Sequence, residues 1–167
     1  MKIALDIGHN CPPDTGAVGI ESEDTLTEAV GNALAVKLKA QGHQIILCCP
    51  PKASSVSDSL SKRVAIANIA NADLFVSIHF NAFNKKAHGT EVFTGSSRGQ
   101  SVAKKVVDAI AALGFRNRGV KDGGHLFVLK HTKMPAILVE CCFIDSPDDM
   151  KIFNTAKMAE AIAAGIG

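Results

Sequence analysis

Apolar positions along this chain recur at two spacings, and each spacing predicts one kind of element. Short runs rich in β-branched and aromatic residues predict strands at residues 2–7, 44–49, 72–82, 90–94, 126–129 and 136–142. Apolar stripes at intervals of three and four residues predict helices at 24–41, 60–70, 101–113 and 156–166. Because strands and helices alternate, we expect one three-layer αβα domain over residues 1–167, with a twisted, mostly parallel but mixed sheet of about six strands.

Local signals refine the ends of two helices. Thr25 and Glu28 match a capping box, which would start the first long helix at Thr25 and leave Glu23 just outside its first turn. Ser146 followed by Pro147 predicts the start of a further short helix, because serine caps helices well and proline suits the first helical position.

The middle of the chain carries weaker signals. The strand at 90–94 is short and follows the apolar strand at 72–82 after only a few residues. We therefore expect these two strands to lie side by side. Residues 116–124 are rich in glycine and charged side chains, which predicts a long polar loop.

The composition is that of an ordinary globular domain and excludes several classes of function. Hydrophobic residues make up 47% of the chain and charged residues 20%, and no apolar run is long enough to span a membrane. A net charge of +2, with no Trp or Tyr, argues against nucleic-acid binding. The first strand starts at once, without the apolar region of a signal peptide, so we expect synthesis in the cytoplasm or excision from a longer exported chain.

The cysteines predict no thiolate metal site. Their number is odd, and no pair has the Cys-x-x-Cys spacing of a structural zinc site. Four of them end apolar runs, as buried free thiols do: Cys48, Cys49, Cys141 and Cys142. Such usage suits a reducing compartment at synthesis. Cys11 differs because it lies in a loop beside His9.

Three apolar strands end at, or contain, a polar side chain that a protein core would not select. The first strand leads into His9, the third ends near His79, and the last carries Glu140. Ligands of open α/β sheets bind beyond the carboxyl ends of the strands, so these residues can meet at one edge. A carboxylate inside an apolar strand needs a cation, a hydrogen-bond network or a raised pKa. The structural alternative for Glu140 is an ion pair with Arg63 or Lys130.

Residues of these types suit a hydrolytic metal centre. Two imidazoles and one carboxylate are a common ligand set of catalytic zinc, with the fourth position left for water. A further carboxylate that does not bind the metal can take a proton from that water. Composition alone leaves open which glutamate binds the metal and which acts as the base.

Short motifs follow one another over nearly the whole chain, and together they resemble those of a known family. They lie at 6–9, 16–19, 42–43, 72–82, 89–93, 118–121 and 134–140. With these motifs the chain resembles the zinc-dependent N-acetylmuramoyl-L-alanine amidases of the Amidase_3 family, which include catalytic domains of phage endolysins and bacterial autolysins. The resemblance implies one Zn²⁺ per chain, held by His9, Glu23 and His79, and a catalytic role for Glu140.

The choice of Glu23 as the acidic ligand depends on spacing within the family. Glu21 and Glu28 stand close by in the sequence. Counting back from Gly42, as family members are spaced, selects Glu23. Its place just ahead of the apolar helical stripe agrees with that count.

The chain departs from the family pattern at two places. Where many members have a glycine-rich segment after the first strand, this chain has His9-Asn10-Cys11-Pro12-Pro13. We expect a stiffer loop there, with Cys11 able to approach the metal. Only a few residues separate the strand that carries His79 from the next strand. Since that leaves no room for the regulatory helix of some bacterial members, we expect an uninhibited, open site.

The resemblance also implies a reaction. The expected activity is peptidoglycan hydrolysis at the amide bond between N-acetylmuramic acid and L-alanine of the stem peptide. Asn81, Arg118 and Lys121 are candidates for contacts with this substrate. Three alternatives stay open: a zinc carboxypeptidase-like peptidase acting on cell-wall peptides, a thiol enzyme with Cys11 as nucleophile and His9 as base, and a wall-binding module without activity.

Peptidoglycan is the one partner that these observations imply. We expect neither nucleic-acid binding nor membrane insertion, and we expect a monomer. The missing signal segment favours an endolysin that acts at the cell wall after release, or a catalytic domain excised from a secreted autolysin. Stem-peptide preference and the presence of a wall-anchoring domain stay open.

Overall fold

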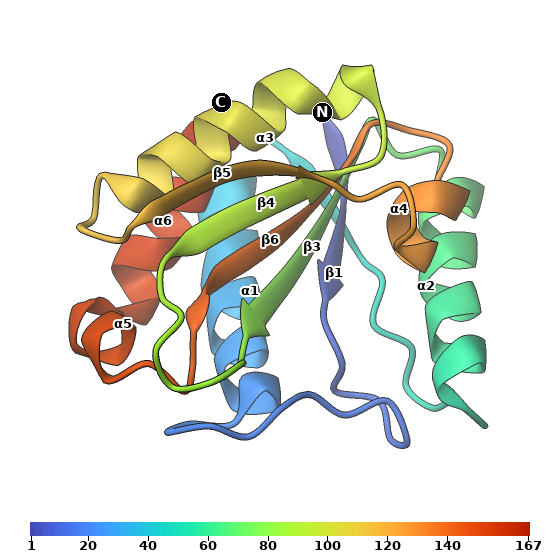
Figure 1. The fold of residues 1–167 in the computed structure, drawn as a ribbon. Coiled ribbons are helices and arrows are strands. Elements are labelled where there is room, and N and C mark those ends of the chain that lie inside the picture. Colours follow the sequence, from blue (N-terminus) through green and yellow to red (C-terminus); the bar gives the residue numbers. More distant parts are fainter.

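A computed structural model describes all residues, 1–167, and shows a six-stranded sheet between two layers of helices (Figure 1). The strands are β1 (Lys2–Ile7), β2 (Gln44–Leu47), β3 (Leu74–Asn81), β4 (Thr90–Thr94), β5 (Asn117–Asp122) and β6 (Ala136–Phe143). The helices are α1 (Glu23–Ala40), α2 (Val56–Ile69), α3 (Ser97–Ala111), α4 (Phe127–His131), α5 (Pro147–Ile152) and α6 (Thr155–Ile166). None of these helices has the length and apolar character needed to cross a membrane.

The strand order confirms the predicted mixed, mostly parallel sheet. The order is β2-β1-β3-β6-β4-β5, and every pair is parallel except β4 with β6. The expectation that the strand at 90–94 lies beside β3 is wrong, because β6 lies between them. β6 is apolar on both faces apart from Glu140, and such a strand is stable only where neighbours and helices cover both of its faces.

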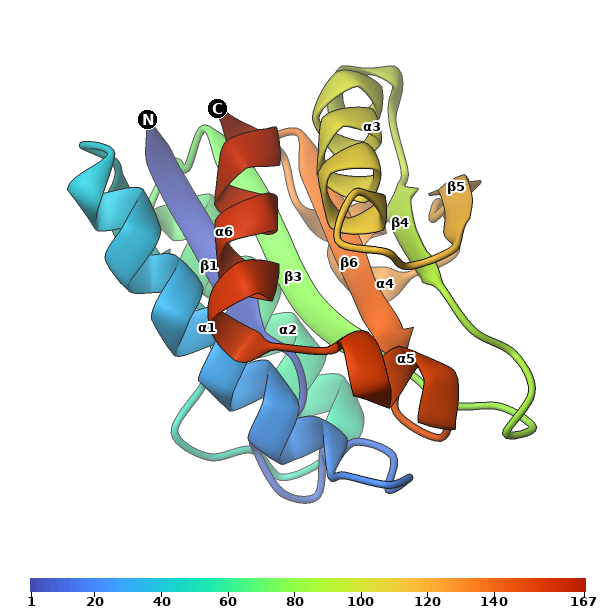
Figure 2. The ribbon, with the colours of Figure 1, turned by 90° about the vertical axis from the view of Figure 1, so that its left-hand side faces the viewer.

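The two faces of the sheet are covered unequally. α1, α3 and α6 cover one face, and with alternate residues of the central strands they form the larger core (Figure 2). α2 and α4 cover the other face over a smaller core that includes Phe75 and Leu138. The next residues of those strands on the same face include His79 and Glu140, which are only partly buried. The polar residues therefore lie where the second helical layer ends.

The first long helix starts earlier than its capping-box signal predicts. α1 begins at Glu23 with Ser22 as its N-cap residue, and the Leu26 amide donates to the Ser22 carbonyl to close the first turn. The Thr25 start is therefore wrong, and Glu23 is the first helical residue. An acidic residue at this position interacts favourably with the positive end of the helix dipole.

Five further borders or assignments differ from the sequence prediction. α2 and α3 each begin four residues before the predicted start, and β2 ends at Leu47 rather than at residue 49. The predicted loop at 116–124 contains β5, an edge strand paired only with β4, and an edge strand needs no apolar alternation. The predicted strand at 126–129 lies mostly in helix α4, because a short apolar run does not by itself distinguish helix from strand.

Candidate metal centre

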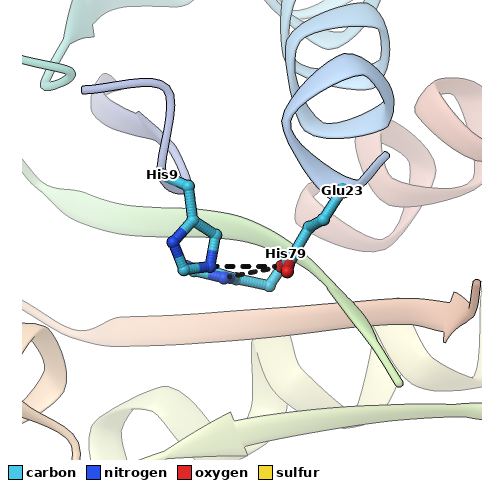
Figure 3. A group of neighbouring side chains, drawn as sticks. All are labelled: His9, Glu23 and His79. Atoms are coloured by element: carbon cyan, nitrogen blue, oxygen red, sulfur yellow. Dashed lines mark hydrogen bonds and ion pairs between the residues drawn. The ribbon is translucent and has the colours of Figure 1, made fainter. Parts of the chain in front are cut away.

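Three side chains from different parts of the chain meet at the carboxyl end of the sheet (Figure 3). His9 follows β1, His79 lies near the end of β3, and Glu23 is the first residue of α1. One ligand atom from each lies within 4.8 Å of the others. Glu23 Oε1 is 3.4 Å from His9 Nε2 and 3.2 Å from His79 Nδ1. The structure thus brings together the three residues expected to bind zinc.

Two glycines allow this close approach. A Cβ atom at Gly8 would lie 2.5 Å from His79 Cε1, and one at Gly16 would lie 2.7 Å from Glu23 Cβ. Both distances are shorter than a van der Waals contact, so any larger residue at Gly8 or Gly16 would displace a proposed metal ligand. His9 itself has a φ of 57°, in the left-handed region that non-glycine residues seldom adopt. Backbone strain of this kind often marks functional sites.

Backbone amides hold the Glu23 carboxylate in place. Its Oε1 accepts a hydrogen bond from the Phe80 amide at 3.1 Å, and its Oε2 accepts one from the Ala17 amide at 2.9 Å. Burial raises the pKa of Glu23, but hydrogen bonds and charges from His79 and His9 outweigh it and hold the pKa well below its usual range. Glu23 is therefore ionised at neutral pH, as a metal ligand must be.

The second ring nitrogen of His9 has its own carboxylate partner. His9 Nδ1 lies 2.8 Å from Asp14 Oδ1, and Asp14 Oδ2 accepts a hydrogen bond from Ser59 Oγ at 2.6 Å. With a proton on Nδ1 donated to Asp14, the lone pair of Nε2 faces Glu23 and is free to bind a cation. Burial lowers the pKa of His9, but Glu23 and Asp14 together raise it to about 9, so a metal ion binding at Nε2 would displace the proton held there at neutral pH.

Buried carboxylates outnumber buried cationic side chains around the cluster. Asp6, Asp14 and Glu23 are buried, whereas Arg63, 1% exposed, is the one buried cationic side chain. Arg63 binds Asp6 at 2.7 Å and Asp14 at 3.4 Å, and it also donates to the carbonyls of Ile7 and His9. A divalent cation would offset the remaining negative charge. Since imidazole nitrogens and a carboxylate oxygen are donors that zinc prefers, the residues present fit that ion.

Glu140 lies beside this cluster rather than in it. It is in register with His79 on the neighbouring parallel strand, so both side chains lie on the same face of the sheet. Burial, with the charges of Glu23 and Glu91, raises the pKa of Glu140 to about 7 against the opposing charge of His79. No ion pair links it to Arg63 or Lys130, and its buried Oε2 has no hydrogen-bond partner. The structural alternative for Glu140 therefore does not hold.

Two of the three predicted substrate contacts are joined by Glu91, which was not among the residues predicted to form the site. Asn81 Nδ2 donates to Glu91 Oε1 at 2.9 Å, and Arg118 Nε donates to Glu91 Oε2 at 3.0 Å. The Arg118 guanidinium also lies 5.1 Å from the centre of the Phe143 ring. Lys121 is exposed on the edge strand β5 and has no part in this group.

Glu140 was identified as an acid within an apolar strand, and the same signal applies to Glu91. It is an acid in the short β-favouring segment Thr90-Glu91-Val92-Phe93, it is only 6% exposed, and it lies opposite Glu140 in the antiparallel pair of β4 and β6. A buried acid with both oxygens hydrogen-bonded is an ordered element of the site. The β-branched and aromatic residues of 90–94 predict a strand but give no role to the acid among them.

Cys11 is not part of the cluster. It is buried, its backbone pairs with Asp14, and its thiol is not among the grouped ligand atoms. The Cys49 thiol donates to the His9 carbonyl at 3.6 Å, away from the ring nitrogens. All five cysteines are free, and Cys49 alone is not fully buried. The Cys49 thiol therefore contacts the backbone of the loop after β1, and no thiol belongs to the cluster of ligand atoms.

A small, mostly apolar cavity opens beside the two histidines on the α2 and α4 side. Its volume is about 160 Å³, and its lining includes His9, His79, Phe127 and Leu138. Helix α4 supplies much of the apolar wall, so the segment whose secondary structure was predicted wrongly forms one side of the site. The connection from β3 to β4 contains no helix.

Comparisons with known proteins identify a single family. The family profile described as N-acetylmuramoyl-L-alanine amidase, Amidase_3, matches residues 3–167. The amidase LytC of Bacillus subtilis is 34% identical over 98% of this chain and 34% of its own length. The endolysin of Bacillus phage SPP1 is 31% identical over 96% of this chain and 61% of its own. An uncharacterised Clostridium perfringens protein is 36% identical over 92% of this chain, which spans 47% of that relative.

Solved structures agree with this assignment. The catalytic domain of the CD27L endolysin, which targets Clostridia difficile, superposes with a TM-score of 0.93 at 26% identity, covering 99% of this chain and 96% of that one. An N-acetylmuramoyl-L-alanine amidase from Clostridium difficile 630 gives a TM-score of 0.85 at 31% identity, covering 99% and 94%. The chain spans less than half the length of several curated relatives but nearly all of these structures.

Proposed function

The chain belongs to the Amidase_3 family of N-acetylmuramoyl-L-alanine amidases, and on that premise we propose that it is a zinc-dependent peptidoglycan hydrolase. The bond cleaved is the amide between N-acetylmuramic acid and L-alanine of the stem peptide. One observation carries the proposal: His9, Glu23 and His79 converge on one point, with Glu140 beside them and outside the ligand set.

Three atoms would hold the ion: His9 Nε2, Glu23 Oε1 and His79 Nδ1. A zinc ion bound there supplies Lewis-acid activation of water and of the scissile carbonyl. Asp14 keeps His9 in the tautomer that exposes Nε2, and the amides of Ala17 and Phe80 keep the Glu23 carboxylate ionised and in position.

Glu140 acts as the general base and then as the general acid. Its carboxylate takes the proton of the attacking water and passes it to the leaving amine of alanine. The side chain suits both steps because it lies beside His79 and its Oε2 is not engaged by any protein donor. Asn81 and Arg118 contact the substrate, held in place by Glu91.

A digestion assay on purified cell walls tests the proposal. We expect new muramic lactyl ends and new L-alanine amino termini in equal amounts, loss of activity with a chelator, and recovery on addition of zinc. Cleavage at another bond, or activity that resists the chelator, would contradict it.

The other functions are less well supported. The carboxypeptidase-like alternative is not favoured, because the matching family and the named relatives are amidases. The thiol enzyme has no thiol at the cluster to serve as nucleophile. We propose that the protein works as a monomer at the cell wall, after release in the manner of an endolysin or as part of a secreted autolysin.

A further inference from the structure

A groove of about 670 Å³ lies at the same end of the sheet as the metal centre. Three segments form it: the loop before α1, the loop after β3, and the turn before α5. Figures 1 and 2 show all three at the lower end of the molecule. The side chains that matter for recognition are Val18, Ile20, Phe83, Lys85 and Asp145.

The groove gathers exposed apolar side chains. Nine large hydrophobic residues of the chain are exposed, and three of them line this one groove: Val18 at 81%, Ile20 at 55% and Phe83 at 78%. Single exposed hydrophobic residues are common on protein surfaces. A group of them along a groove marks an interaction site.

Hydrogen bonds hold both walls of the groove in place. Asp145 Oδ2 accepts from the Phe83 amide at 3.0 Å and from the Lys85 amide at 2.9 Å. The Ile20 amide donates to the Ile144 carbonyl at 2.8 Å. Because the exposed side chains stand on a backbone that is already ordered, a ligand loses less free energy to the ordering of these loops.

Both walls are continuous with the metal centre. Val18 directly follows Ala17, whose amide donates to Glu23 Oε2. On the other wall, the Phe80 amide donates to Glu23 Oε1, and Ala82 lines the groove two residues later. Consecutive Cα atoms are about 3.8 Å apart, so Ala82 lies within about 8 Å of Phe80.

We infer that this groove binds the stem peptide of the substrate, on the side of the scissile amide that carries L-alanine. The inference rests on the proposed function. Aliphatic side chains of the peptide pack against Val18, Ile20 and Phe83, and a peptide carboxylate pairs with Lys85. An extended tetrapeptide is about 13 Å long, enough to pass from the metal centre into a groove that starts this close.

Kinetics with two substrates test the inference. N-acetylmuramoyl-L-alanine ends at the metal centre, whereas N-acetylmuramoyl tetrapeptide reaches the groove. We expect Phe83→Ala to lower kcat/KM for the tetrapeptide substrate about five- to tenfold, equivalent to about 1–1.4 kcal/mol, with less than a twofold change for the short one. Ile69→Ala is the matched control, since Ile69 is 81% exposed but lies on α2. Equal losses on both substrates, or none on either, would overturn the inference.

A second variant and a binding measurement separate this inference from the activity itself. Lys85→Asn removes the charge, and asparagine tolerates the φ of 63° at this position. This variant should also lower kcat/KM for the tetrapeptide substrate only. In NMR titrations with synthetic L-alanyl-D-isoglutamyl-L-lysyl-D-alanine, the amide shifts of Gly19 and Phe83 should move and saturate. If neither amide shifts, the groove does not bind the stem peptide, whether or not the protein hydrolyses peptidoglycan. Saturating shifts without hydrolysis refute the amidase proposal but still support binding of the peptide in the groove.

Discussion

Glu140 and His79 occupy paired positions on the adjacent parallel strands β6 and β3. Their side chains therefore lie on one face of the sheet, at the point where helices α2 and α4 no longer cover it. This pairing places a carboxylate that is free of protein hydrogen-bond donors at Oε2 directly beside a proposed metal ligand. A base that must exchange protons with water and with a leaving group needs such a free oxygen.

Replacing Glu140 by glutamine tests its role as the base. We expect Glu140→Gln to lower kcat about 10²- to 10⁴-fold while the protein keeps one zinc per chain, because the amide cannot accept the water proton. Kinetics on cell walls and elemental analysis of the purified variant measure the two effects. Loss of zinc from this variant would assign Glu140 to the metal instead.

Zinc should stabilise the fold as well as support activity. The site brings the carboxylate of Glu23 and two imidazoles together only in the folded chain, so an ion bound there favours folding. At a free concentration of about 100 times the Kd, zinc should add about 2.7 kcal/mol to the free energy of unfolding. Thermal melts with chelator and with zinc measure this. His79→Ala is the control, and its melting temperature should not respond to zinc.

Asp14 should tune the affinity for zinc without binding it. Asp14→Asn weakens the hydrogen bond that orients His9, and we expect the affinity to fall about 10- to 100-fold. Competition with a chromophoric chelator measures the change. Asp148→Asn, an exposed acid on α5, serves as the comparison and should bind zinc like the unaltered protein. Equal affinities of both variants would show that Asp14 does not support the ligand.

Arg63 should matter for stability. It is buried and binds two buried carboxylates, so Arg63→Met leaves Asp6 and Asp14 without their cationic partner. We expect the free energy of unfolding to fall by about 3–5 kcal/mol, measured by urea titration with zinc removed. Arg98→Met, on the exposed side of α3, should change it by no more than about 0.5 kcal/mol.

Glu91 should affect substrate binding more than the chemical step. Glu91→Gln removes the charge that holds Arg118 and weakens the contact with Asn81. Losing a hydrogen bond between charged groups costs about 1.5–3 kcal/mol, so we expect KM to rise about tenfold or more, with a smaller change in kcat. Arg118→Lys should shift KM in the same direction, because lysine lacks the planar fork of arginine. A fall in kcat alone would place Glu91 in the proton transfer.

The pattern of apolar residues was sufficient for the elements that form the centre of the fold. β1, β6 and α6 were predicted to within about one residue, because β1 and β6 are apolar runs rich in β-favouring residues and α6 has an apolar stripe at helical spacing. The same pattern made His9, His79 and Glu140 visible as polar residues where a core was expected. Family motifs then selected Glu23, which the structure places between the two histidines.

Only the tertiary structure decided the strand order, the edge strand β5 and the group formed by Glu91, Asn81 and Arg118. Periodicity reports which face of an element is buried, but it carries no information about which element packs against that face. Polar residues on an edge strand have the composition of a loop, and only the pairing with a neighbouring strand distinguishes the two. The same limit applies to Glu91, whose hydrogen-bond partners come from β3 and β5 and become its neighbours only when the sheet forms.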